Sequence, residues 1–107
     1  MTKAKFIYEN NLFSKLEISG HSGYADYGSD IVCSGISSAV LTSINLIDKY
    51  TKDYQLTQDD KKGYLCFILN DFNNNENHIS LIIENLIEVL EQIESSYPKN
   101  LIITIKK

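Results

Sequence analysis

Two reactive side chains, His21 and Cys33, stand at opposite ends of a glycine-bearing segment in this 107-residue sequence. An imidazole placed beside a thiol can remove its proton and stabilise the thiolate, which is the nucleophilic form of sulfur. The pair therefore indicates nucleophilic catalysis if the fold brings the two side chains together. A structural cysteine and an incidental histidine would leave the same spacing, so the spacing alone does not decide.

The sequence predicts that a helix begins just before Cys33. Residues of one helical face recur at spacings of three and four; they are Val32, Ile36, Ala39, Val40, Ser43, Ile44 and Ile47. Ser29 or Asp30 is the predicted N-cap, because either side chain accepts hydrogen bonds from the free N–H groups of a first turn. The predicted helix holds Cys33 in its first turn and ends near Tyr50.

The helix start favours a thiolate at Cys33, but only weakly. The dipole contributes about 0.3–1 kcal/mol, whereas one unit of pKa corresponds to about 1.36 kcal/mol. The imidazolium of His21 would have to supply most of the stabilisation. The N–H groups of the same turn would also form an oxyanion hole for a carbonyl under attack.

Two further side chains are candidates for supporting roles. Asp30 would cap the helix, orient the imidazole of His21, or do both with different oxygens. Ser37 follows Cys33 by one helical turn and would donate a hydrogen bond in the site, although a plain surface serine fits the same position.

The segment between the pair has the composition of a loop over a substrate. Gly23 and Gly28 permit unusual backbone angles, and Tyr24 and Tyr27 would flank a bound peptide. These residues form either a mobile lid or an ordinary surface loop.

Two hairpins are predicted by alternating apolar and polar residues. Residues 3–9 and 12–19 flank Asn10-Asn11, which suits a two-residue turn. Residues 54–57 and 64–69 flank a polar turn and form the second hairpin.

A broad apolar face predicts a second helix, which ends before Pro98. The face consists of Ile79, Ile82, Ile83, Leu86, Ile87, Leu90 and Ile93, and the solvated acidic stripe opposite it of Glu84, Glu88, Glu91 and Glu94. The polar residues 70–77 suit a loop whose last residues cap this helix. Residues 101–105 then predict a well-buried last strand.

The predicted order of elements is ββαββαβ, in one domain over residues 1–107. Hydrophobic residues make up 43% of the chain, which is enough for one core. This predicts an α+β single-domain sandwich with a five-stranded, largely antiparallel or mixed sheet and two helices.

Composition excludes several classes of function. The net charge of −4, with ten basic residues and no arginine among them, argues against direct nucleic-acid binding. The sequence shows no apolar leader and no apolar run of about 20 residues, which predicts a cytoplasmic protein with reduced thiols and no membrane contact.

Cys66 and His78 are expected to take no part in catalysis. Cys66 lies on an apolar strand, where an inert core thiol is the simplest interpretation, and His78 opens the second helix in solvent. A zinc site built from them with His21 and Cys33 lacks any Cys-x-x-Cys pair, so we expect neither metal nor cofactor.

A longer pattern surrounds the pair: Gly20-His21, then Ala25, Gly28, the run Asp30-Ile31-Val32-Cys33, and Ser37. This pattern resembles the signature of the ribosomal-processing cysteine proteases, the Prp or YsxB-like family. The length of the chain and the order of its elements fit as well, so the resemblance covers the whole chain. Ser22 and Ser34 depart from it, since the family often has alanine there, but both are small and should leave the chemistry intact.

The resemblance implies a function that the composition does not show. His21 and Cys33 would form the catalytic dyad of an endopeptidase that acts during ribosome assembly. Its substrate would be the precursor of a large-subunit ribosomal protein, from which it removes an N-terminal extension after a phenylalanine-containing motif. The resemblance also implies a small homodimer with a flexible loop over the active site.

One alternative from another class remains open. The chain would then be a non-catalytic ribosome-associated interaction or assembly module, whose loop binds a partner while Cys33 merely starts a helix. The reactivity of the Cys33 thiol distinguishes the two.

Overall fold

The computed structural model describes residues 1–26, 28–70 and 76–107, and it confirms the predicted order of elements. Their bounds are β1 Thr2–Glu9, β2 Leu12–Ser19, α1 Ile31–Asp48, β3 Tyr54–Asp59, β4 Tyr64–Leu69, α2 Glu76–Ser96 and β5 Leu101–Lys106. In the first hairpin Asn10 and Asn11 have φ of 54° and 65°, as a tight two-residue turn requires. The predicted cap of α2 falls largely outside the described residues.

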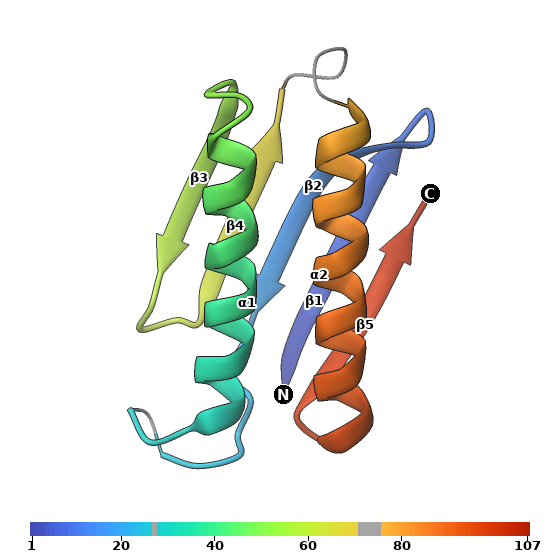
Figure 1. Ribbon diagram of the computed structural model, residues 1–107. Coiled ribbons are helices and arrows are strands. Elements are labelled where there is room, and N and C mark those ends of the chain that lie inside the picture. The colour runs from blue at the N-terminus through green and yellow to red at the C-terminus, as the bar shows by residue number, and fades with distance from the viewer. Residues whose placement is uncertain (27, 71–75) are drawn as a thin grey trace.

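The five strands form one sheet in the order β3-β4-β2-β1-β5. The pairs β1–β2, β2–β4 and β3–β4 are antiparallel, whereas β1 and β5 are parallel. Both helices cover the same face of the sheet, α1 toward its β3 end and α2 toward its β5 end (Figure 1). The predicted sandwich with a mixed sheet is confirmed.

The core lies between the sheet and the two helices. The buried helical residues are those that the spacing predicts: Val32, Ile36, Val40, Ser43, Ile44 and Ile47 of α1, and Ile79, Ile83, Leu86, Ile87 and Leu90 of α2. From the sheet, Phe67 is wholly buried and stacks on Phe13, with ring centroids 6.2 Å apart. By length and composition alone α1 could cross a membrane, but core helices share these properties, and α1 buries one face in this core.

The last strand differs from the prediction of a well-buried strand. β5 is the edge strand beside β1, and Ile102 and Ile105 are 44% and 43% exposed. A short apolar run in the sequence does not show whether the strand lies at the edge or at the centre of a sheet, because that position depends on the topology. The backbone N–H of Ile103 donates to the Glu94 carboxylate at 2.9 Å. Glu94 is half-buried, so the prediction that it lies in a solvated stripe is wrong. Its carboxylate covers part of the exposed edge of β5.

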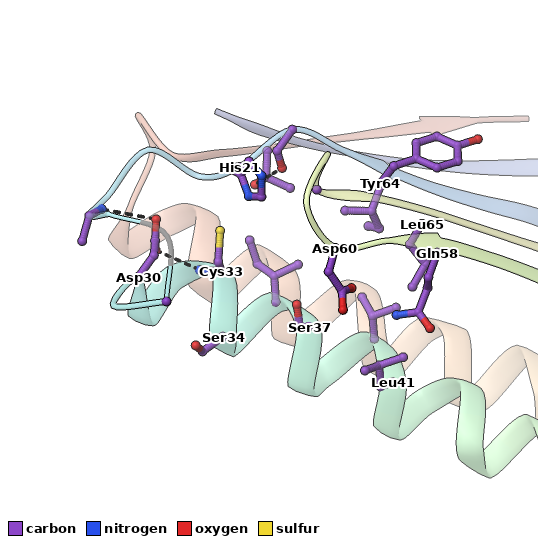
Figure 2. Close-up of a pocket in the computed structure, with 18 of the residues that line it drawn as sticks. His21, Asp30, Cys33, Ser34, Ser37, Leu41, Gln58, Asp60, Tyr64 and Leu65 are labelled. Carbon is purple, nitrogen blue, oxygen red and sulfur yellow. Dashed lines mark hydrogen bonds between the residues drawn. The ribbon is translucent and has the colours of Figure 1, made fainter.

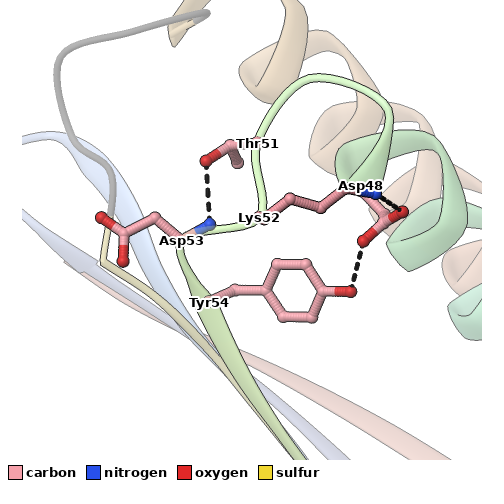
Figure 3. Close-up of polar contacts among 5 residues, drawn as sticks. All are labelled: Asp48, Thr51, Lys52, Asp53 and Tyr54. Carbon is pink, nitrogen blue, oxygen red and sulfur yellow. Dashed lines mark hydrogen bonds and ion pairs between the residues drawn. The ribbon is translucent and has the colours of Figure 1, made fainter.

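A polar cluster joins the end of α1 to β3 (Figure 3). Asp48 lies in the last turn of α1, where the helix dipole disfavours a negative charge. Its carboxylate accepts from Lys52 Nζ at 2.5 Å and from the Tyr54 hydroxyl at 2.6 Å. These bonds lower the pKa of Asp48 and hold the start of the second hairpin against α1.

Candidate active site

Asp30 is the N-cap of α1 and places Cys33 in the first helical turn, as the sequence predicts. Asp30 has extended backbone angles, and its Oδ1 accepts from the N–H groups of Val32 and Cys33, both at 3.0 Å. Its backbone carbonyl accepts from the N–H of Ser34 at 3.1 Å. The N–H groups of Val32, Cys33 and Ser34 are thus already bonded, and the oxyanion hole expected from them is not free.

The second oxygen of Asp30 fastens the loop that precedes the helix. Oδ2 accepts from the Ser22 hydroxyl at 2.5 Å and from the N–H groups of Tyr24 and Ala25 at 3.1 and 3.2 Å. Burial of Asp30 favours its neutral form, but these bonds and the one from Cys33 N–H outweigh it and lower the pKa of Asp30 to about 2. The ionised carboxylate thereby ties the first part of the loop to the helix start.

Ser22 connects this loop to Cys33 and to the rest of the fold. Its side chain is 1% exposed, and its backbone N–H donates to Cys33 Sγ at 3.2 Å. Its carbonyl accepts from Asn100 Nδ2, just before β5, at 3.0 Å. Ser22 therefore contacts Cys33 through its backbone N–H, while its hydroxyl bonds to Asp30.

His21 lies across the groove from Cys33, whose sulfur points toward it (Figure 2). The Nε2 atom of His21 lies 2.8 Å from the carbonyl oxygen of Lys61, in the turn between β3 and β4. The residue before it, Gly20, is fixed by a 2.9 Å hydrogen bond from the Thr2 hydroxyl to its carbonyl oxygen. Segments distant in sequence therefore set the place of the imidazole.

A groove of about 670 Å³ contains both side chains. Polar residues Ser34 and Ser37 of α1 and Gln58 and Asp60 of the second hairpin border it (Figure 2). Apolar side chains of both layers also line it; they are Ile18, Ile36, Val40, Leu41 and Leu65. The groove offers an apolar lining beside a thiol, an imidazole and several hydrogen-bonding groups.

The residues predicted to form a substrate loop do not all face this groove. Gly28, with φ of 90°, lines it, as do Ala25 and Asp26. Tyr24 instead packs edge-on against Tyr97, with ring centroids 5.2 Å apart. Gly23, with φ of 75°, is not among the groove residues, and Tyr27 lies outside the described residues.

Cys66 and His78 lie apart from the groove. Cys66 is a free thiol and is 9% exposed. Its neighbours Leu65 and Phe67 point into the core, so by strand alternation Cys66 lies on the sheet face that the helices leave uncovered. His78 is exposed and stacks on Tyr50. Within residues 1–26, 28–70 and 76–107, no three His, Cys, Asp or Glu side chains gather as a metal site would require.

Three contributors to the site were missed in the sequence analysis. Ser22 appeared there only as a small replacement for alanine, although an Asp beside a serine-bearing loop can signal a shared hydrogen bond. The carbonyl of Lys61 has no signal in the sequence, because every residue type carries one. Gly63 belongs to the predicted polar turn, and a Cβ there would lie 3.1 Å from Nδ1 of His21. This closeness depends on the pairing of distant strands.

Known proteins resemble this chain in sequence. The family model described as cysteine protease Prp matches residues 1–102. The ribosomal processing cysteine protease Prp of Staphylococcus aureus is 34% identical over 83 residues, which cover 77% of this chain and 76% of that protein. The protein of the same name from Bacillus subtilis is 31% identical over 91 residues, which cover 82% and 81%.

Solved structures agree with these relatives. The crystal structure of an essential ribosomal processing protease Prp from S. aureus, in complex with a covalently linked product peptide, has a TM-score of 0.87 at 28% identity. It covers 99% of this chain and 100% of that one. A second S. aureus structure, in complex with a substrate peptide, has a TM-score of 0.82 at 25% identity, with the same coverage.

The fold, the thiol in a groove and these relatives define the class of protein, a cysteine protease. The match over residues 1–102 and the two relatives above 30% identity then fix the family. The chain belongs to the cysteine protease Prp family.

Proposed function

We propose that this protein is an endopeptidase that removes the N-terminal extension of a large-subunit ribosomal protein during ribosome assembly, with His21 and Cys33 as its catalytic dyad. The observation that carries the proposal is the Cys33 sulfur at a helix start, directed across a groove toward His21. The family supports it, since the relatives are named as ribosomal processing proteases.

In the proposed mechanism His21 removes the proton of the Cys33 thiol, and the thiolate attacks the scissile carbonyl carbon to give a tetrahedral oxyanion. When this intermediate collapses, the C–N bond breaks and the imidazolium gives its proton to the leaving amine. A thioester to Cys33 remains. His21 then deprotonates a water molecule that attacks the thioester, which releases the carboxylic acid product and restores the thiol.

The oxyanion needs a donor other than the first-turn N–H groups, which Asp30 already occupies. Ser37 lies one helical turn beyond Cys33 and lines the groove on the same side. Its exposed hydroxyl can rotate to meet an oxygen of a bound peptide. We assign Ser37 as a donor to the oxyanion, while Asp30 supports the site by capping the helix and holding the loop.

The groove suits a peptide with a large apolar side chain. Ile18, Ile36 and Leu65 line it beside the polar rim, so a phenylalanine in the substrate would find an apolar surface close to the thiol. Among the predicted loop residues, Gly28 would contact the peptide, whereas Tyr24 anchors the loop on Tyr97. The S. aureus relative has been solved with a substrate peptide and with a covalently linked product peptide, which supports a peptide as the substrate.

The proposal includes a cellular setting. The protein would act in the cytoplasm as a homodimer, without direct contact to nucleic acid or membrane and without a metal or cofactor. The net charge of −4 and the absence of arginine support the lack of nucleic-acid binding. Light scattering coupled to size exclusion measures the mass of the assembly directly.

Cleavage of a purified ribosomal-protein precursor, followed by mass spectrometry, tests the proposed endopeptidase activity.

A further inference from the structure

The turn between β3 and β4 reaches the active site from a distant part of the sequence. Asp59 Oδ1 accepts from the Lys62 N–H at 3.2 Å, and the Gly63 N–H donates to the Asp60 carbonyl at 3.2 Å. These bonds fold the turn so that the Lys61 carbonyl points at the His21 ring, with its oxygen 2.8 Å from Nε2.

This contact determines which nitrogen of His21 carries the proton. A carbonyl oxygen can only accept a hydrogen bond, so Nε2 must be the donor and carry the hydrogen. In a neutral imidazole the lone pair then belongs to Nδ1. Cysteine proteases with a Cys-His-Asn arrangement use a third group to fix the histidine in this way. Asp30 was the predicted candidate for this orienting role, but both of its carboxylate oxygens accept hydrogen bonds from backbone N–H groups and from the Ser22 hydroxyl.

Gly63 allows the turn to come this close. Its φ is 62°, and a Cβ at this position would lie 3.0 Å from the carbonyl carbon of Gly20 and 3.1 Å from Nδ1 of His21. Such distances are shorter than ordinary van der Waals contacts, so any side chain at Gly63 would push against the imidazole of His21 and the carbonyl group of Gly20. Glycine therefore has a spatial role at this position in addition to its conformational one.

We propose that the β3–β4 turn positions the catalytic histidine: the Lys61 carbonyl holds His21 as the Nε2–H tautomer, and the bare Cα of Gly63 leaves Nδ1 room to take the proton of Cys33. This inference rests on the proposed dyad, and the turn acts on it through its contacts with His21. Lys61 and Gly63 are thus positioning residues.

Nitrogen-15 NMR of histidine-labelled protein tests the tautomer without any substrate. The chain has two histidines, so His78→Gln assigns their signals, and the exposed His78 serves as the internal reference in the unmodified protein. At pH 8 and above we expect one tautomer for His21, with a resolved, slowly exchanging proton on Nε2. A neutral His21 with its proton on Nδ1, or a fast-exchanging mixture of its two neutral tautomers, would overturn the proposal.

Gly63→Asn tests the spatial role. Asparagine already occupies left-handed positions in this chain, at Asn10 and Asn11, so this variant adds the Cβ contact with little backbone strain. We expect kcat to fall about 10- to 100-fold with KM nearly unchanged, and the single His21 tautomer to be lost. Lys62→Ala, in the same turn, is the matched control and should retain full activity.

A folded Gly63→Asn protein with unchanged kcat and an unchanged His21 signal would also refute the proposal. If that variant fails to fold, the NMR result on the unmodified protein decides alone. The result is separable from the proposed function, because a protein that shows the expected tautomer but cleaves no precursor would refute the peptidase assignment and leave the positioning of His21 intact.

Discussion

The Ser22 hydroxyl donates a 2.5 Å hydrogen bond to Asp30 Oδ2, and the two side chains are only 1% and 5% exposed. Ser22 directly follows His21, and Asp30 caps the helix that carries Cys33. One carboxylate therefore joins the two segments that hold the proposed dyad. The geometry of the site depends on the ionised form of Asp30.

Asp30→Asn should destabilise the fold in a way that depends on pH. Because hydrogen bonds lower the pKa of Asp30 from 3.8 to about 2, the folded state binds this proton less readily than the unfolded state. The stabilisation is therefore complete above about pH 5 and is lost as the pH falls toward about 2. At pH 7 we expect the variant to lose about 2 kcal/mol in free energy of unfolding, since the Tyr24 and Ala25 N–H groups lose their acceptor.

Urea unfolding of wild type and Asp30→Asn at pH 7 and near pH 2.5 measures this effect. The contributions of the other carboxyl groups to the free energy of unfolding cancel in the difference between the two proteins. That difference should shrink at the lower pH. Ser22→Ala is the companion variant: it removes one donor but keeps the charge, so its smaller loss of about 1 kcal/mol should accompany intact cleavage. An equal difference between wild type and Asp30→Asn at both pH values would show that ionisation of Asp30 contributes nothing.

Ser37→Ala tests the assigned oxyanion donor. Loss of a hydroxyl that meets the oxyanion in the transition state should lower kcat about 10- to 100-fold and leave KM within about threefold. Ser38→Ala is the control, since Ser38 is exposed on α1 but does not line the groove. Steady-state cleavage of a fluorogenic peptide gives both constants, and equal kcat values for the two variants would contradict the assignment.

Much of the fold is predictable because local patterns determine it. The spacing of Val32 and Ile36 predicts α1, and Asn10-Asn11 predicts a turn that the measured angles confirm. The exposure of Ile102 could not be predicted, since it follows from the edge position of β5. Within the site, the capping of α1 is a local property: Ser29 and Asp30 were the two predicted caps, and the structure has Asp30.

The long-range contacts of the site were not predictable in the same way. The bonds from the Ser22 hydroxyl and from the Lys61 carbonyl depend on how a loop and a hairpin meet in space. For Tyr24 the sequence predicted a contact that the structure does not show. Its aromatic side chain suited a bound peptide, whereas the fold places it against Tyr97.

Thiol alkylation distinguishes a protease from a non-catalytic interaction module. Cys33 lies in the groove beside His21, whereas Cys66 is buried on the other sheet face. Near neutral pH we expect iodoacetamide to modify Cys33 at least about ten times faster than Cys66, and His21→Ala to remove most of this advantage. Peptide mass mapping measures both rates. If Cys33 is modified fast and its rate is unchanged in His21→Ala, its reactivity reflects exposure alone. Equal slow rates for Cys33 and Cys66 would favour the interaction module.

Cleavage of the ribosomal-protein precursor is the most direct test of the central claim. Purified wild-type protein is incubated with a large-subunit ribosomal protein that carries a phenylalanine-containing N-terminal extension, and intact mass spectrometry follows the products. We predict release of the extension by the wild type, none by Cys33→Ala, and unchanged release by Cys66→Ala. Cleavage by Cys33→Ala at the wild-type rate, or an intact precursor with the wild type, would contradict the assignment.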